Sequence, residues 1–373
     1  MLYKPDTEKA ASSVFDLTSF NIDNFREKLI AWFKSNKRDL PWRKTNNWYP
    51  VFLSEFLLQQ TQVDQALPYY KKFIKQFPDI LSLSKATEQE VLKLWAGLGY
   101  YSRARNMLKA AIRICDDFDG QFPESYIDAV SLPGIGDYTA SAILSIAFDK
   151  LLPVVDGNVQ RVITRIFAVP DDIRLGKTNK MIQEICTELL DPINPGNFNE
   201  GIMELGAVIC IPKNPKCEKC PVSNHCTAYL SQSIQRFPYK SPPTPKKIWY
   251  HLVIVPRFHK EILIVKRRSS GLLASLWEFP VVEVKDLDIN VNEINNLIEK
   301  KYNLRGKIKS IGKRMIHVYT HIRLQYIPVL YELTGKITPE LNDYTDFSWV
   351  NFEELNNYPI HNAHKKIIEW INV

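Results

Sequence analysis

Four of the chain's six cysteines fall within 17 residues, at Cys210, Cys217, Cys220 and Cys226. Three prolines stiffen the same segment, whereas Cys115 and Cys186 stand alone elsewhere in the chain. Four thiolates from one short loop can enclose a tetrahedral zinc ion or an iron–sulfur cluster. This cysteine loop (210–226) therefore predicts a metal centre, and the donor chemistry by itself leaves both metals open.

The segment from residue 21 to residue 235 has the apolar spacing of helices. Ile22, Phe25 and Leu29 recur at three and four residues, which places one apolar stripe on a helix. Further helical patterns cover 49–66, 67–77, 87–94, 102–116, 125–132, 138–148, 158–167, 179–190 and 199–209. We predict an all-helical domain over 21–235, which includes the cysteine loop and follows an N-terminal extension over 1–20.

A proline-rich stretch and a change of pattern follow. Residues 237–245 contain four prolines in nine positions, which predicts a stiff linker over 236–247. Alternating and β-branched runs then predict strands over 249–256, 262–266, 278–284, 307–316, 320–333 and 347–350, with helices over 291–302 and 362–371. The chain is therefore expected to be multidomain, with an α+β domain over 248–373 after the helical one.

Composition places the chain among folded proteins, because 45% of its residues are hydrophobic and 24% are charged. No apolar run approaches the roughly 18 residues of a membrane helix, and no secretory signal begins the chain, so we expect no membrane partner and a cytoplasmic, nucleoid-associated protein. The net charge of +7 permits a polyanionic partner without requiring one. Residues 241–373 contribute +5 of it, which leaves the helical part nearly neutral.

Two glycines, Gly134 and Gly136, lie between two expected helices in the string LPGIGDYTA. Backbone N–H groups of such a turn, together with the next helix N-terminus, suit a DNA phosphate. The string resembles the hairpin of the helix-hairpin-helix DNA glycosylases, and the cysteine spacing resembles the iron–sulfur loop of the same superfamily. The resemblance implies double-stranded DNA as the partner and a [4Fe-4S] cluster bound by the four cysteines.

Glu55 and Asp156 are the candidate catalytic carboxylates. Glu55 stands among apolar neighbours on an expected helix, and burial there favours its protonated form. The surrounding string SEFLLQQT resembles the adenine glycosylase branch of the superfamily, which implies that Glu55 protonates the adenine base. The same resemblance implies that Asp156 stabilises an oxocarbenium-like sugar and that Tyr138 and Asn158 orient groups beside it.

Tyr138 also separates two kinds of glycosylase. Members that cut the strand have a lysine here to form a Schiff base, and this chain has none from Ser131 to Asp149. We therefore expect a monofunctional glycosylase. The alternatives are a bifunctional glycosylase/lyase of the endonuclease III type and a non-catalytic DNA-binding iron–sulfur protein.

The resemblance extends to residues expected to contact the DNA. Extruding a base requires a side chain that fills the stack behind it, and Tyr100, helped by Leu98, matches that wedge. Gln60 and Thr61 match residues that touch the base opposite the adenine. The remaining pocket and DNA contacts are expected at Arg38, Trp42, Arg43, Leu58 and Glu200.

The C-terminal domain resembles a Nudix fold at the string GLLASLWEFP (271–280). The helix expected to bind magnesium in that fold has too few carboxylates here, so nucleotide hydrolysis is not expected. Adenine glycosylases use a Phe-Ser-His string in this domain to recognise 8-oxoguanine, and Tyr319, Thr320 and His321 occupy that place. The expected function is removal of adenine opposite 8-oxoguanine, and opposite guanine, by a monomer.

Overall fold

The structure is a computed structural model that describes residues 17–45, 47–242, 245–319, 321–336, 338–341 and 343–371. Its internal contacts divide the chain into two units. The first takes its described residues from 17–56 and 117–242, and the second from 57–116 and 243–371. Each unit is described by itself.

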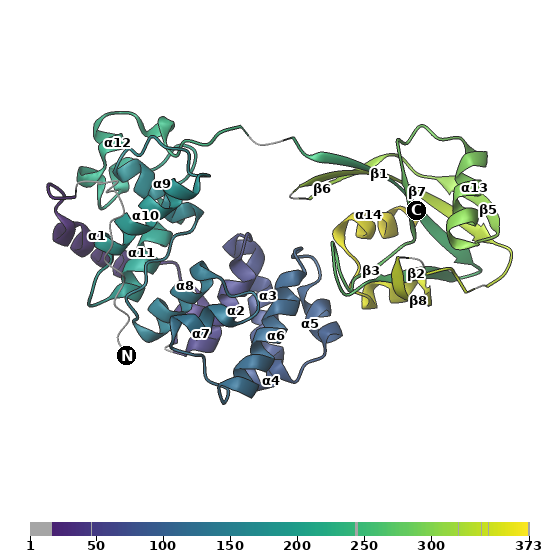
Figure 1. Ribbon diagram of the computed structural model, residues 1–373, viewed down its shortest axis with the longest axis horizontal. Helices are drawn as coiled ribbons and strands as arrows, with labels where there is room; N and C mark the ends of the chain where they lie inside the picture. The colour runs from purple at the N-terminus through teal and green to yellow at the C-terminus, as the bar shows by residue number, and fades with distance from the viewer. Residues whose placement is uncertain are drawn as a thin grey trace. The chain divides into compact units, whose positions relative to one another are not determined.

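The first unit is built from helices (Figure 1). They are α1 (Ile22–Asn36), η1 (Pro41–Arg43), α2 (Trp48–Leu58), α7 (Tyr126–Ser131), α8 (Asp137–Phe148), α9 (Gly157–Ile166), α10 (Gly176–Leu189), α11 (Pro195–Val208), η2 (Cys217–Lys219), η3 (Ser223–His225), α12 (Thr227–Leu230) and η4 (Ile234–Arg236). The described residues of 17–242 contain no strand, as the helical spacing predicted.

Helix α11 packs against α1, α8 and α9 in the core of this unit. Two glycines allow the close approach. A Cβ on Gly201 would lie 3.3 Å from the Cβ of Phe33 in α1, and one on Gly206 would lie 2.7 Å from the Cβ of Asn158 in α9. The first turn of α9 is therefore fixed by backbone contact with α11.

The second unit holds the remaining elements: α3 (Val63–Gln76), α4 (Ile80–Ser84), α5 (Glu88–Trp95), α6 (Ser102–Asp117), β1 (Lys247–Phe258), β2 (Glu261–Arg267), β3 (Trp277–Glu278), β4 (Val281–Val284), α13 (Val291–Tyr302), β5 (Gly306–Ile311), β6 (Met315–Val318), β7 (Ile322–Leu333), β8 (Tyr344–Asn351), η5 (Phe352–Asn357) and α14 (Asn362–Ile371). The strands form one mixed sheet in the order β3-β2-β1-β7-β5, with β4 paired to β1, β6 to β7 and β8 to β2. Among the strand pairs of the described residues, the central β1–β7 pair is parallel and the others are antiparallel.

Alternate residues of β1 enter two different cores. Val253 and Val255 pack with α14, whereas Leu252 and Ile254 pack with α13. A strand buried on both faces reads as a continuous apolar run, which explains why β1 is hydrophobic through its middle. The predicted fold class, a helical domain followed by an α+β Nudix-like domain, is confirmed by this architecture.

Three element boundaries were predicted wrongly. The helix expected over 49–66 ends at Leu58 and resumes at Val63, because Gln60 adopts a left-handed conformation with φ +56°. The strand expected over 278–284 is divided at Pro280, which cannot donate to a ladder, and the strand expected over 307–316 is divided into β5 and β6. The short helices α4 and α12 have too few residues for a helical period to show.

No helix in the described part of the chain combines the length and the apolar character that crossing a bilayer requires.

Replacing Gly206 with alanine should destabilise the first unit. The added Cβ would clash with Asn158 and with its backbone carbon, 3.2 Å away, so α9 must shift. We expect a loss of about 1–3 kcal/mol in the free energy of unfolding. Gly176→Ala is the control, since its Cβ meets open space at the start of α10. A G206A variant as stable as G176A in urea denaturation would contradict the close packing of α11 on α9.

Candidate functional site

Glu55 lies on α2 with its carboxyl buried. The side chain is 6% exposed, and Oε2 has no hydrogen-bond partner among the described residues. The pKa of Glu55 is raised to about 8, chiefly by burial, with the hydrogen bond from the Tyr138 hydroxyl opposing the rise and the charges of Asp156 and Glu200 adding to it. Glu55 is therefore protonated at neutral pH and can act as an acid.

Asp156 occupies the N-cap of α9. Its Oδ1 accepts a hydrogen bond from the Val159 N–H at 2.7 Å, and its Oδ2 accepts one from Asn158 Nδ2 at 2.8 Å. These donors and the helix dipole favour negative charge at this position. The first unit thus places Glu55 in a buried environment and Asp156 among hydrogen-bond donors. Such a difference lets one carboxyl act as the acid and the other stabilise positive charge.

Tyr138 stands in the first turn of α8 with its hydroxyl buried. Burial, followed by the charges of Glu55 and Asp156, raises the pKa of Tyr138 well above its usual value. The hydroxyl also donates to Met203 Sδ at 3.6 Å. The structure brings Glu55, Tyr138, Asp156 and Asn158 together, with the tyrosine as a neutral polar group.

Arg38 and Arg43 are engaged by two glutamates of α11. Glu204 accepts from Arg38 Nε and Nη2 at 2.8 Å each and from Arg43 Nη2 at 3.1 Å. Arg43 Nε also donates to Glu200 Oε1 at 2.7 Å. Although burial raises it, the pKa of Glu204 is held at about 2 by these two arginines. Both arginines predicted to contact DNA are thus engaged in internal ion pairs, Arg38 with Glu204 and Arg43 with Glu204 and Glu200.

Sequence analysis missed Glu204. It lies four residues after Glu200 and therefore on the same face of α11, which is the signal that could have found it. Trp42, predicted as a pocket residue, is 7% exposed on η1.

The hairpin turn joins α7 to α8. Gly134 has φ +78°, a conformation that favours glycine, and Ile135 anchors the turn at 3% exposure. Gly136 caps α8 with nothing within 4 Å of where a Cβ would stand. The start of α8 therefore has open space beside Gly136, and N–H groups at a helix N-terminus suit a phosphate.

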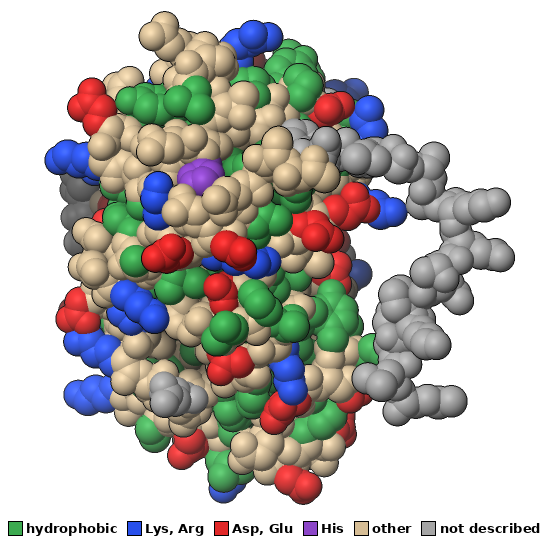
Figure 2. Space-filling view, turned by 90° about the vertical axis from the view of Figure 1, so that its left-hand side faces the viewer, with side chains coloured by type: hydrophobic (Ala, Val, Ile, Leu, Met, Phe, Trp, Pro, Cys, Tyr) green, Lys and Arg blue, Asp and Glu red, His purple; other side chains and the backbone are tan. Residues whose placement is uncertain are grey.

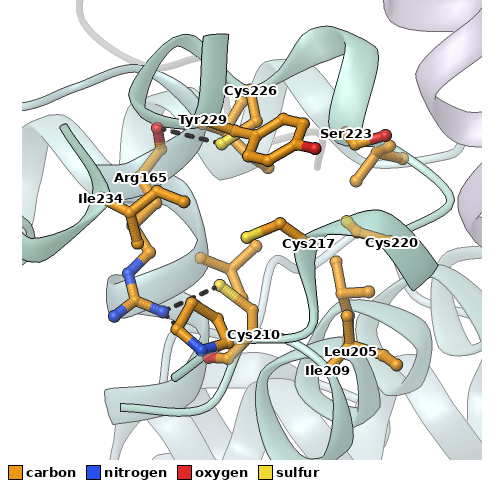
Figure 3. A pocket seen from close by; sticks show the side chains of 14 residues that line it. Arg165, Leu205, Ile209, Cys210, Cys217, Cys220, Ser223, Cys226, Tyr229 and Ile234 are labelled. Atoms are coloured by element: carbon orange, nitrogen blue, oxygen red, sulfur yellow. Dashed lines mark hydrogen bonds between the residues drawn. The ribbon is translucent and has the colours of Figure 1, made fainter. Parts of the chain in front are cut away.

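The four cysteines of the cysteine loop line one pocket (Figure 3). None of the four is in a disulfide bond. Arg165 of α9 donates from Nη1 to Cys210 Sγ at 3.3 Å, and its backbone oxygen accepts from Cys226 Sγ at 3.4 Å. Four sulfur donors around one cavity, with hydrogen bonds to the sulfurs, fit an iron–sulfur cluster.

A chain of contacts leads from this loop to Asp156. Arg161 donates from Nε to the Cys210 carbonyl at 2.8 Å and from Nη2 to Asn158 Oδ1 at 2.8 Å. Asn158 in turn donates to Asp156. The backbone that carries the first cysteine and the candidate catalytic carboxylate thus share one hydrogen-bond network.

In the second unit, the expected DNA contacts lie on two segments. Gln60 is exposed, and Leu58 and Thr61 are half-buried after α2. Tyr100 is 49% exposed with φ +46°, whereas Leu98 is 6% exposed. Tyr100 therefore presents the surface that a wedge needs, whereas Leu98 is buried.

The C-terminal string is described in part. His321 is exposed and Tyr319 is half-buried at the end of β6, where its carbonyl accepts from Lys246 Nζ at 2.9 Å. Thr320 lies outside the described residues. The exposure of His321 leaves its ring free to meet a ligand.

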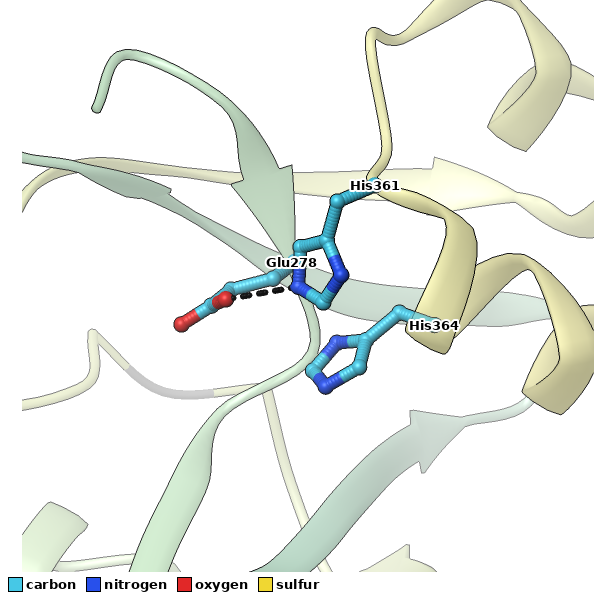
Figure 4. Close-up of side chains that lie close together, drawn as sticks. All are labelled: Glu278, His361 and His364. Carbon is cyan, nitrogen blue, oxygen red and sulfur yellow. Dashed lines mark hydrogen bonds and ion pairs between the residues drawn. The ribbon is translucent and has the colours of Figure 1, made fainter. Parts of the chain in front are cut away.

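A buried polar cluster that the sequence did not reveal lies in the same domain (Figure 4). Glu278 accepts from Arg267 at 2.7 Å and contacts His361 Nε2 at 2.9 Å, and His364 Nδ1 accepts from the Phe279 N–H at 3.1 Å. These three acid and imidazole groups have the residue types of a cation site, and hydrogen bonds engage Glu278 and His364 Nδ1, whereas His361 Nδ1 has no hydrogen-bond partner among the described residues. The cluster is a polar core beside a cavity of about 270 Å³.

Figure 2 shows one face of the molecule with Lys and Arg side chains interspersed among Asp and Glu. No broad area of one sign covers that face. On this face the pattern agrees with the near-neutral composition of the helical part.

Three family models match separate parts of the chain. Residues 53–192 match the family of HhH-GPD superfamily base excision DNA repair proteins, 210–226 match the iron–sulfur binding domain of endonuclease III, and 251–370 match the NUDIX domain. The cofactor expected from the cysteines, a [4Fe-4S] cluster, is confirmed by the second of these matches.

Relatives that cover most of this chain are named adenine DNA glycosylases. An adenine DNA glycosylase of Buchnera aphidicola (from Schizaphis graminum) is 36% identical, covering 83% of this chain and 88% of the relative. The mouse adenine DNA glycosylase is 32% identical over 95% of this chain and 78% of its own. A solved thermostable thymine-DNA glycosylase superposes with a TM-score of 0.53 at 30% identity, covering 58% of this chain and all of that one.

Removing the Glu204 carboxylate should destabilise the first unit. Glu204→Gln leaves two arginines without their shared charge partner, so we expect a loss of about 3 kcal/mol in the free energy of unfolding. Asp39→Asn, which breaks the exposed Lys44–Asp39 pair, is the control and should cost at most about 1 kcal/mol. Equal denaturation midpoints for the two variants would refute the role given to Glu204.

The raised pKa of Glu55 should make the stability of the folded protein depend on pH. Between pH 4.5 and about pH 8 the folded protein keeps this proton while the unfolded chain releases it, so the native state loses stability as pH rises across that window. Glu55→Gln lacks this titration. The melting temperature of E55Q minus that of the wild type should therefore grow as the pH is raised through the window and then level off. A difference that is flat with pH would exclude the raised pKa.

Proposed function

The chain belongs to the adenine DNA glycosylase family, and we propose that it removes adenine standing opposite 8-oxoguanine or guanine in double-stranded DNA. The observation that carries the proposal is the pair of carboxyl groups in one unit, with Glu55 kept neutral by burial and Asp156 bonded by N–H donors. Cleavage of an N-glycosidic bond needs both an acid for the base and a negative charge for the sugar.

The reaction follows from these two states. An adenine extruded from the duplex receives the proton of Glu55, so it leaves as a neutral base when the bond from C1′ to its nitrogen breaks. The sugar becomes oxocarbenium-like, and Asp156 stabilises that cation. A water oxygen then bonds to C1′ and loses its proton, which leaves an abasic site and restores the protonation of the enzyme.

The absence of an amine keeps the reaction monofunctional. Tyr138 occupies the position beside the carboxyl groups, and its neutral hydroxyl cannot form a Schiff base. The nearest following lysine, Lys150, is paired with Glu124 at 2.7 Å. Asn158, held by Arg161, orients the Asp156 carboxylate.

We assign the adenine pocket to Trp42 and Glu200. Trp42 supplies an apolar wall, and Glu200 offers carboxylate oxygens to the base while Arg43 fixes its position. Arg38 and Glu204 complete the support from behind.

The remaining residues hold the duplex. Gly134 and Gly136 present N–H groups to a phosphate, and Tyr100 fills the gap left by the extruded base. Leu58, Gln60 and Thr61, with Tyr319, Thr320 and His321 from the other domain, contact the base opposite the adenine.

Cys210, Cys217, Cys220 and Cys226 would bind the [4Fe-4S] cluster, which supplies a fixed anchor for the loop between them when bound. Lys213, Lys216 and Lys219 are exposed on this loop and offer charge to a phosphate. We propose domains over 21–235 and 248–373 joined by 236–247, and a monomer that works on nucleoid DNA.

A duplex with adenine opposite 8-oxoguanine tests the proposal, with alkali used to convert abasic sites into strand breaks. The wild type should give breaks only after alkali. Glu55→Gln and Asp156→Asn should bind the duplex and cut at least about 100-fold more slowly, because each removes one half of the chemistry. Glu184→Gln, on the exposed side of α10, is the control and should retain the wild-type rate.

Three results would count against it. Absence of breaks after alkali would exclude the glycosylase, and breaks without alkali would favour the glycosylase/lyase. Equal rates opposite 8-oxoguanine and opposite thymine would exclude the proposed selectivity.

A further inference from the structure

We propose that Arg103 is a positioning residue that fixes two loops as one preorganised unit for base extrusion. The first, here the opposite-base loop, is 57–61, and the second, the wedge loop, is 97–100. This inference rests on the proposed function, since it concerns how those loops act on DNA. It adds a residue that contacts neither base nor phosphate.

The guanidinium of Arg103 bonds to the opposite-base loop at several points. Nη1 donates to the Leu57 carbonyl at 3.1 Å and to the Gln59 carbonyl, and Nη2 donates to Thr61 Oγ1 at 3.2 Å. The carbonyls at the end of α2 have no partner within their own helix. Arg103 therefore satisfies the end of α2 where the chain turns away from helix.

The same group bonds to the wedge loop. Nη2 donates to the Gly99 carbonyl at 3.4 Å, and the guanidinium carbon lies 5.1 Å from the ring centre of Trp95 and 5.7 Å from that of Tyr100. Trp95 Nε1 donates to the same Gly99 carbonyl at 2.9 Å. One planar cation thus sits between two segments about 40 residues apart in sequence.

Both loops hold a non-glycine residue in the left-handed region. Gln60 has φ +56° and Tyr100 has φ +46°, and these are the two side chains expected to enter the duplex. Such conformations are strained for residues other than glycine and persist only where neighbouring contacts determine them. The contacts of Arg103 lie beside both residues, so they account for the persistence.

Arg103 is 7% exposed. Another cationic side chain could not make the same set of contacts with both loops. A guanidinium has five donors in a flat fork and can reach both loops while lying against an aromatic ring. A lysine ammonium keeps the charge but is a single point that cannot span the two loops. Arg103→Lys therefore separates the fork from the charge.

The test uses full-length wild type, Arg103→Lys, Thr61→Val and Lys109→Gln. Thr61→Val removes one acceptor of the opposite-base loop, and Lys109→Gln removes an exposed charge from the same helix as Arg103. Duplex affinity, the single-turnover excision rate and 2-aminopurine fluorescence beside the target adenine are measured for each. Amide hydrogen exchange is measured without DNA.

We expect R103K to bind the duplex within about threefold of wild type while it excises adenine about tenfold to 100-fold more slowly, with less 2-aminopurine signal. Its preference for 8-oxoguanine over guanine opposite the adenine should shrink. T61V should show a smaller change in the same direction, and K109Q none. Amide exchange should accelerate in both loops together in R103K.

Two outcomes would overturn the inference. One is exchange that accelerates in a single loop, or in neither. The other is an R103K variant that loses rate while the opposite-base preference and the fluorescence stay at wild-type values. A wild type without excision activity would refute the proposed function, and the exchange experiment would still decide whether Arg103 couples the loops.

Discussion

The packing of α11 against α1, α8 and α9 is the contact on which the first unit depends. Gly201 and Gly206 allow the helices to approach so closely that the first turn of α9 has one position. The same helix carries Glu200 and Glu204, which hold the arginines of the pocket, and it leads directly into the cysteine loop. Helix α11 therefore positions Asp156 at the N-cap of α9, the arginines bound by Glu200 and Glu204, and the start of the cysteine loop.

The sequence revealed best what is local. An aspartate before a helical pattern predicts an N-cap, and Asp156 is one; the period over 362–371 predicted α14 with its observed bounds. The helical and α+β halves were also apparent, because their periods differ. The break at Gln60 was not, since apolar spacing continues across it and the left-handed turn is stabilised by Arg103 from a distant segment.

The sequence also did not predict the buried ion pairs. Glu204 and Arg38 are 166 residues apart, and Glu278 and His361 are 83 apart, so neither residue carries a local signal of its partner. A charged residue in a helical pattern is most often solvated, and only tertiary packing turns it inward. The roles of Glu55 and Asp156 came from resemblance for the same reason: burial decides which carboxyl is neutral, and burial is not written in the neighbouring residues alone.

The charge distribution bears on how such a protein distinguishes its substrate. A broad positive surface binds any duplex and adds equally to right and wrong sites. Here the helical part is nearly neutral, and its phosphate contacts are expected from a few N–H groups at Gly134 and Gly136 and from exposed lysines of the cysteine loop. A few phosphate contacts of this kind position the DNA backbone without dominating the free energy of binding. Discrimination then falls to steps that only a mispair satisfies, namely extrusion of the adenine and contact with the base left behind. This is why the conformations of Gln60 and Tyr100 matter more than the net charge of the helical part.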